Sequence, residues 1–217
     1  GWMPILLQKA KSEVQPGNIG YFMASKYTPV IDIPKTIDRS HGDVHPEGNP
    51  HIHLDPHNII LVAKELNRRL TIIDPKNKSY YQSKYNNFID RWENSLLRWN
   101  KEIESIKGKK IVIHHKSFDY FINWAELNII ASLEVKPGIP PTTSHLRNIL
   151  KNTNKNKVDI IVISPYDPTE GALWLSEKIQ IPFVTLPYTV GGNEESNNLI
   201  ALFDSSIKIL QNALYDK

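Results

Sequence analysis

The sequence contains no cysteine among its 217 residues. This absence excludes disulfide bonds, thiolate metal sites and cysteine nucleophiles, and it fits an oxidising exterior as well as the cytosol. The sequence also lacks any run of eighteen or more apolar residues, so it predicts no membrane-spanning helix. The first residues show no basic region followed by a small-residue cleavage site, and we therefore identify no secretory signal.

An excess of charge of one sign is missing too. The chain has 26 Lys and Arg against 23 Asp and Glu, a formal net charge of +3, and its basic residues are scattered. Nucleic-acid-binding proteins typically gather basic residues into a patch with interleaved aromatics. We therefore expect no nucleic-acid partner. With 40% hydrophobic and 23% charged residues, the composition is that of an ordinary globular protein.

Familiar catalytic motifs are also missing. The sequence has no His-Glu-x-x-His helix, no Gly-x-Ser-x-Gly elbow and no Walker loop. The pair Gly191-Gly192 could begin an anion-binding helix, but the acidic residues Glu194 and Glu195 that follow would repel phosphate. We interpret this pair as a turn, and we expect that the protein is not an enzyme.

Two long helices are predicted in the first half of the chain. Asp55 and Pro56 have the residue types of an N-cap and a first helical position, for a helix that runs to about Leu70. From Pro75 to Ile106 apolar residues recur at spacings of three and four, which indicates one long amphipathic helix. Such a helix is longer than a compact domain needs, and we expect it to connect two lobes. Before these helices, the sequence predicts a short helix over residues 1–10 and irregular structure over residues 16–40.

After Gly108 short apolar strands alternate with helical patterns. Uniformly apolar strands between helices indicate a parallel sheet that is covered on both faces. Ligands of such sheets bind beyond the carboxyl ends of the strands. The predicted strands are 111–113, 129–133, 160–163 and 183–186, and the predicted helices lie near 118–127, 143–152, 169–178 and 199–214.

Histidines cluster just before the first long helix and follow the first predicted strand. Five lie between positions 41 and 57, among them His51 and His53 in a loop that prolines restrict. Of His114 and His115, only one can face a given cleft, because neighbours in a strand point to opposite faces. Neutral imidazole is a good ligand for Zn, Mn and Fe. Each histidine taken alone could instead cap or hydrogen-bond a polar loop.

A carboxylate follows the second predicted strand. Glu134 leads into a Pro-rich loop, where by itself it could pair with Lys136 or a backbone amide as readily as with a ligand. The histidine loop and the two strand ends can, however, converge on one cleft. Nitrogen and oxygen ligands without sulfur suit Zn²⁺, Mn²⁺ or Fe²⁺. The sequence therefore predicts a divalent metal site, with His51, His115, Glu134 and His53 as candidate ligands.

Three segments carry a resemblance to a known family. They are GDVHPEGNPHIHLDP at 42–56, IHHKSFDYF at 113–121 and LEVKPGIPP at 133–141. Together they resemble the zinc and manganese solute-binding proteins of ABC importers, the ZnuA/TroA-like family, over essentially the whole chain. The resemblance implies two α/β lobes joined by a long rigid helix. It also implies that Zn²⁺ or Mn²⁺ is captured as the transported ligand in the cleft between the lobes and delivered to a membrane permease.

The resemblance assigns site residues as well. A Pro-His-x-Trp-type motif of the family falls on His51, and a histidine that follows the first strand of the second lobe falls on His115. His53 stands where many members have tryptophan. The late aspartate of the family has no counterpart in LPYTVGG at 186–192, where water, Glu134 or His53 could replace it. The first histidine ligand of the family lies upstream of the segment that Gly1 matches, so we expect an incomplete amino-terminal lobe.

The expected fold is α/β, with two lobes that hold parallel sheets and a long backbone helix between them. Residues 1–74 would form the remainder of the amino-terminal lobe with its histidine-rich loop, 75–107 the linking helix, and 108–217 the carboxy-terminal lobe. We expect a monomer in the periplasm or tethered outside the cell, with no small organic substrate. Two alternatives stay open: a metal-dependent hydrolase with Glu134 as the base, and a surface adhesin of the same fold.

Overall fold

The computed structural model describes residues 3–35 and 45–215. His41 and residues 42–44 of the histidine-rich segment therefore lie outside the described residues. Within the described residues, no strand precedes the first long helix, and the short helix expected over residues 1–10 is limited to five residues. The amino-terminal elements are α1 (Met3–Leu7) and the 3₁₀ turns η1 (Ser12–Val14), η2 (Ala24–Tyr27) and η4 (Ile52–Leu54).

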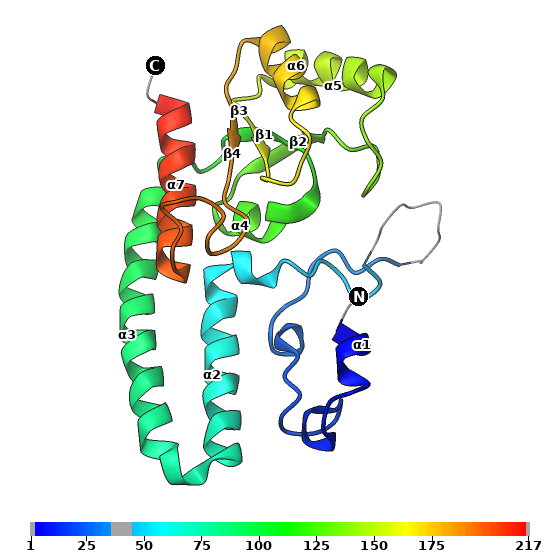
Figure 1. Ribbon diagram of the computed structural model, residues 1–217. Coiled ribbons are helices and arrows are strands. Elements are labelled where there is room, and N and C mark those ends of the chain that lie inside the picture. The colour runs from blue at the N-terminus through cyan, green and yellow to red at the C-terminus, as the bar shows by residue number, and fades with distance from the viewer. Residues whose placement is uncertain (1–2, 36–44, 216–217) are drawn as a thin grey trace.

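Two long helices form an antiparallel pair at one end of the molecule (Figure 1). The first, α2 (Pro56–Ile73), begins as predicted at Asp55, whose carboxylate accepts a hydrogen bond of 2.8 Å from the backbone N–H of His57. A 3₁₀ turn, η5 (Pro75–Asn77), then leads into α3 (Lys78–Ile103). The expected long helix is therefore present but shorter at both ends, because the residues from Pro75 form this turn and a looser turn follows Ile103.

The second half of the chain forms one parallel sheet. Its strands lie in the order β2-β1-β3-β4, and each neighbouring pair is parallel. All four expected strands are present within one or two residues of their expected bounds, so the predicted α/β class with a parallel sheet and a long helix is confirmed. The strands are β1 (Lys110–Ile113), β2 (Asn128–Ser132), β3 (Ile160–Ile163) and β4 (Phe183–Thr185).

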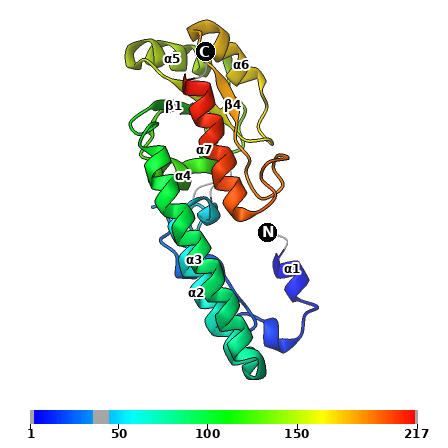
Figure 2. The same cartoon turned by 90° about the vertical axis from the view of Figure 1, so that its left-hand side faces the viewer.

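Helices cover both faces of this sheet (Figures 1 and 2). On one face α5 (Thr143–Asn156) and α6 (Glu170–Ile179) pack with Val112, Ile161 and Ile163. On the other face α4 (Asp119–Trp124), α7 (Leu199–Tyr215) and the end of α3 pack with Ile111, Ile113 and Val162. Successive residues of a strand thus enter opposite cores, as the uniform apolar character of the strands predicts.

The core also fixes the histidine-rich loop in front of α2. Trp92 of α3 is fully buried, and its indole N–H donates a hydrogen bond of 2.9 Å to the carbonyl of Pro56. Leu54 of η4 is buried in the same cluster. The loop therefore contacts both the helix pair and the core of the carboxy-terminal half. None of the helices in the described ranges is both long and apolar enough to cross a membrane.

Candidate metal site

Local hydrogen bonds hold His51 in place. The side-chain carbonyl of Asn49 accepts a hydrogen bond of 3.0 Å from the backbone N–H of His51, and its amide donates one of 3.0 Å to the carbonyl of Lys116. Gly48, the residue before Asn49, has φ +93°, and a Cβ there would lie 2.5 Å from the side chain of Val30. Only glycine fits this position, since both the positive φ and the close approach exclude other side chains.

His115 leaves the sheet just beyond β1, and Glu134 follows β2. The Nδ1 atom of His115 lies 2.6 Å from Oε2 of Glu134, and the other carboxylate oxygen accepts a hydrogen bond of 3.3 Å from the backbone N–H of Gly138. Glu134 therefore pairs with His115 and with a backbone amide together. The neighbouring His114 is buried, and its Nε2 is 4.0 Å from the same carboxylate.

Two adjoining hollows lie at this edge of the sheet. One has a volume of about 260 Å³ and includes His51 in its wall, while the other has about 320 Å³ and includes Glu134 and Tyr188. His45 and His115 line both hollows. The carboxyl ends of β1, β2 and β4 thus meet the histidine loop here, as expected for a parallel sheet.

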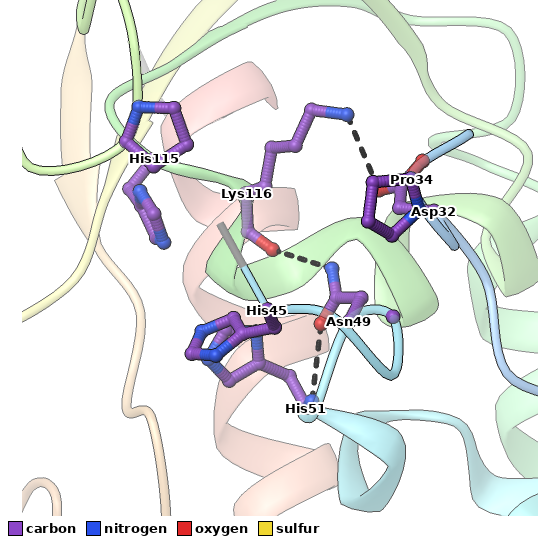
Figure 3. A pocket seen from close by; sticks show the side chains of 9 residues that line it. Asp32, Pro34, His45, Asn49, His51, His115 and Lys116 are labelled. Carbon is purple, nitrogen blue, oxygen red and sulfur yellow. Dashed lines mark hydrogen bonds and ion pairs between the residues drawn. The ribbon is translucent and has the colours of Figure 1, made fainter. Parts of the chain in front are cut away.

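Two other histidines, His45 and His115, lie close to His51 (Figure 3). The ring centroid of His51 is 6.3 Å from that of His45 and 6.2 Å from that of His115. Nitrogen ligands of Zn²⁺ lie about 2.0–2.1 Å from the ion, so neighbouring imidazoles must turn their nitrogens toward one point. In the part of the chain that the structure describes, no three His, Cys, Asp or Glu side chains are yet arranged to hold a metal ion.

The predicted candidates therefore differ in placement. The rings of His51 and His115 are adjacent and nearly perpendicular, and Glu134 contacts His115. His53 lines neither hollow, and its Nε2 lies 3.0 Å from the carbonyl oxygen of Tyr188.

His45 was not among the predicted candidates. Its signal in the sequence is its position six residues before His51, in the same proline- and glycine-containing loop.

The environment of His51 keeps its imidazole neutral. Burial, followed by the charges of His115, His53 and His45, lowers the pKa of His51 to about 4. Its Nδ1 is buried and has no hydrogen-bond partner within the described residues. A neutral imidazole with a free nitrogen is the form that binds a metal ion.

Asp32 lines the smaller hollow and forms a carboxyl pair with Asp119. Asp32 and Asp119 share a hydrogen bond, and Nζ of Lys116 lies 3.2 Å from Asp32. Burial, together with the hydrogen bond and the charge of Asp32, raises the pKa of Asp119 to about 7. Burial acts to raise the pKa of Asp32 as well, but its bonds to Asp119 and Lys116 outweigh it and lower that pKa. Asp119 is thus the more readily protonated of the two carboxyl groups.

This pair gives a pH-dependent prediction. Because the pKa of Asp119 is raised on folding, its contribution to stability is fully present below pH 3.8 and is lost as the pH rises toward about 7. Asparagine does not ionise, so Asp119→Asn lacks the pH-dependent loss of folding stability that the ionisation of Asp119 causes. The variant should therefore become more stable relative to wild type as the pH rises from about 4 to about 8. Urea unfolding across that range measures the difference, with exposed Asp90→Asn as the control. A difference that is constant with pH would contradict the assignment.

Known proteins that resemble this chain are metal-binding proteins. A family model described as ZnuA, zinc-uptake complex component A, periplasmic, matches residues 2–213. The metal ABC transporter substrate-binding lipoprotein SloC of Streptococcus mutans is 26% identical over 165 residues, which cover 75% of this chain and 54% of SloC. The manganese ABC transporter substrate-binding lipoprotein PsaA of Streptococcus pneumoniae is 21% identical over 190 residues, covering 87% and 59%. The chain thus spans between half and three-fifths of these relatives.

Solved structures show the same architecture. A crystal structure of ZnuA aligns with a TM-score of 0.67 at 18% identity and covers 80% of this chain and 62% of that one. A Cd-bound periplasmic metal binding protein from Candidatus Liberibacter asiaticus aligns with a TM-score of 0.64 at 15% identity, covering 81% and 69%. At these identities the likeness concerns the fold. The family match extends over nearly the whole chain, and the protein therefore belongs to the ZnuA family of metal-binding ABC transporter substrate-binding proteins.

Proposed function

We propose that this chain binds Zn²⁺ or Mn²⁺ as a transported ligand between the histidine loop and the end of β1. The observation that carries the proposal is the buried, unpartnered Nδ1 of His51, which belongs to a neutral ring 6.2 Å from that of His115. A buried polar atom without a partner is destabilising, and a metal ion would satisfy it. Small rotations of the two imidazoles would bring both to one ion, and His45 is positioned to be a third ligand.

Glu134 has a supporting role in this proposal. A histidine that binds a metal through one nitrogen typically donates its other N–H to a carboxylate, which fixes the tautomer and the ring orientation. The contact of 2.6 Å between Nδ1 of His115 and Glu134 has this geometry. It leaves Nε2 of His115 for the ion. The same contact weakens the hydrolase alternative, because a carboxylate held by His115 and Gly138 is not free to act as a general base.

The proposed biological role follows from the family. Relatives such as SloC and PsaA are named as substrate-binding lipoproteins of metal ABC transporters. We propose that this protein likewise delivers metal to an ABC permease outside the cytoplasm, as a monomer. In this account residues 1–74 supply the histidine loop, 75–107 the linking helix and 108–217 the second lobe. Its ligand is the ion alone, with no organic substrate.

Glu134→Gln tests the proposed site. The substitution keeps the size of the side chain but places a neutral amide against His115, so the affinity for Zn²⁺ should fall by about 10–100-fold. Competition with a chromophoric chelator measures the dissociation constant. Glu126→Gln is the matched control, since Glu126 is exposed and pairs with Lys107 far from the site. Equal affinities of wild type and Glu134→Gln would contradict the proposal.

A further inference from the structure

Tyr188 connects two histidines of the loop, His51 and His53. It lies just beyond β4, where its ring centroid is 5.4 Å from that of His51 and 5.5 Å from that of His53. Both contacts are nearly edge-on, with interplanar angles of 76° and 81°. Aromatic pairs with this geometry attract each other by their edges and faces. The ring of Tyr188 is thus in contact with His51, the central imidazole of the candidate site.

The hydrogen bond of His53 shows which of its nitrogens is engaged. Nε2 of His53 is 3.0 Å from the carbonyl oxygen of Tyr188. A carbonyl oxygen only accepts hydrogen bonds, so Nε2 must carry the proton and donate it. This leaves only Nδ1 of His53 with a lone pair for a metal ion, and His53 lines neither hollow of the candidate site. This contact joins residues 135 positions apart in the sequence.

The loop that follows Tyr188 is closed tightly behind it. The backbone N–H of Gly192 donates a hydrogen bond of 2.9 Å to the carbonyl of Thr189, and that of Gly191 donates one of 2.7 Å to the carbonyl of Ser196. A Cβ at Gly192 would lie 2.9 Å from the Thr189 oxygen and 3.1 Å from the backbone nitrogen of Tyr188. The Gly-Gly pair therefore permits a turn that packs closely against the backbone of Tyr188, and the carbonyl of Tyr188 contacts His53.

We propose that His53 is a positioning residue and not a metal ligand: by holding the carbonyl of Tyr188 it sets the Tyr188 ring against His51 and so fixes the orientation of that imidazole. This inference rests on the proposed metal site. It assigns roles to His53 and to the segment after β4. Neither needs to touch the ion to fulfil its role.

Four single variants and one double variant separate positioning from ligation. His53→Ala and Tyr188→Ala should each weaken Zn²⁺ and Co²⁺ binding by about tenfold, and the double variant by no more than either alone, because both break one chain of contacts. His53→Trp should stay within about twofold of wild type, since its indole N–H can donate to the carbonyl but cannot bind metal. Tyr188→Phe should also stay close to wild type, because the ring and the backbone carbonyl make the contacts.

The visible spectrum of bound Co²⁺ gives the second readout. Its band positions depend on the donor atoms, so they should be the same in His53→Ala as in wild type although the affinity is lower. A change in the bands on His53→Ala, without recovery of affinity in His53→Trp, would show that His53 is a ligand. Losses that multiply in the double variant would show that His53 and Tyr188 act separately. Either outcome would overturn the inference.

A measurement without metal keeps this inference distinct from the proposed function. In the metal-free chain, the ring-nitrogen NMR spectrum of His53 should show a protonated Nε2 and an unprotonated Nδ1. The opposite tautomer would overturn the inference even if metal binds. If wild type binds neither Zn²⁺ nor Co²⁺ while His53 shows the expected tautomer, the proposed function fails and the His53–Tyr188 contact stands.

Discussion

Replacing either His51 or His115 by alanine is expected to remove most of the stabilisation that Zn²⁺ gives to this chain. A ligand at about 100 times its dissociation constant adds roughly 2.7 kcal/mol to the free energy of unfolding. For a chain of this size that corresponds to a rise in Tm of roughly 5–10 °C. Each variant should keep only a small part of this shift, since His51 and His115 come from separate elements and neither can bind the ion tightly alone. Thermal unfolding with and without Zn²⁺ is the measurement.

His57→Ala is the control for this experiment. His57 lies near the same loop, but its side chain is exposed and pairs with Asp55 at the start of α2. It should keep the full metal-induced shift. If His51→Ala and His115→Ala also kept the full shift with both Zn²⁺ and Mn²⁺, these residues would not be the ligands.

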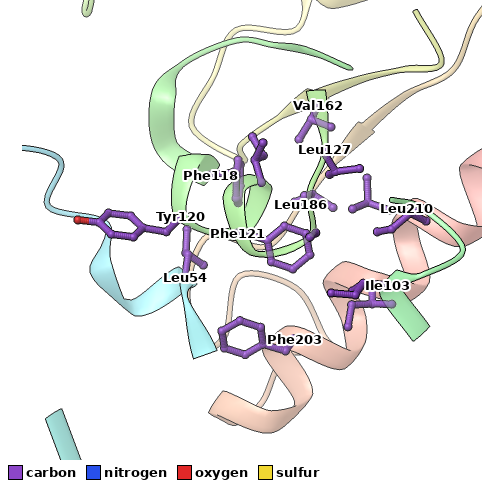
Figure 4. Packing of buried hydrophobic residues seen from close by; sticks show 14 of the residues in the cluster. Leu54, Ile103, Phe118, Tyr120, Phe121, Leu127, Val162, Leu186, Phe203 and Leu210 are labelled. Atoms are coloured by element: carbon purple, nitrogen blue, oxygen red, sulfur yellow. The ribbon is translucent and has the colours of Figure 1, made fainter. Parts of the chain in front are cut away.

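Trp99→Ala is expected to have the largest effect on folding. The side chain of Trp99 is fully buried in α3, and its ring centroid is 5.2 Å from that of Trp92 and 5.0 Å from that of Phe203. Phe203 also stacks with Phe121, so the same cluster joins α3 and α7 to α4 below the sheet (Figure 4). Removing the indole leaves a cavity and should lower the free energy of unfolding by about 3–5 kcal/mol.

Leu97→Ala is the matched control in the same helix. Its side chain is 63% exposed, so the loss should be within about 0.5 kcal/mol. Urea unfolding of both variants measures the difference. Similar losses in the two variants would contradict the packing described here.

The fold could be predicted in outline because its periodic signals are strong. Apolar runs such as Ile160–Ile163 predict strands buried on both faces, and the spacing of apolar residues after Pro75 predicts a long helix. The exact ends could not be predicted, because they depend on local contacts. For example, Asp74 accepts hydrogen bonds from the side chains of Asn77 and Tyr81, which stabilise the turn before α3.

The site could be predicted only where a topological rule applies. His115 and Glu134 follow neighbouring parallel strands, so the sequence already places them at one edge of the sheet, and the structure shows them in contact. The sequence does not show that His45 lies beside His51, since two residues of an irregular loop have no fixed spacing in space. Nor does it show that His53 bonds to Tyr188, because that contact joins distant segments.

X-ray absorption at the zinc edge of the Zn²⁺-loaded chain tests the central claim most directly, since it reports the atoms bound to the ion. The account predicts nitrogen neighbours at about 2.0–2.1 Å with the outer-shell scattering of at least two imidazoles, and loss of one imidazole in His51→Ala. A first shell of oxygen alone, or a spectrum that His51→Ala leaves unchanged, would contradict it.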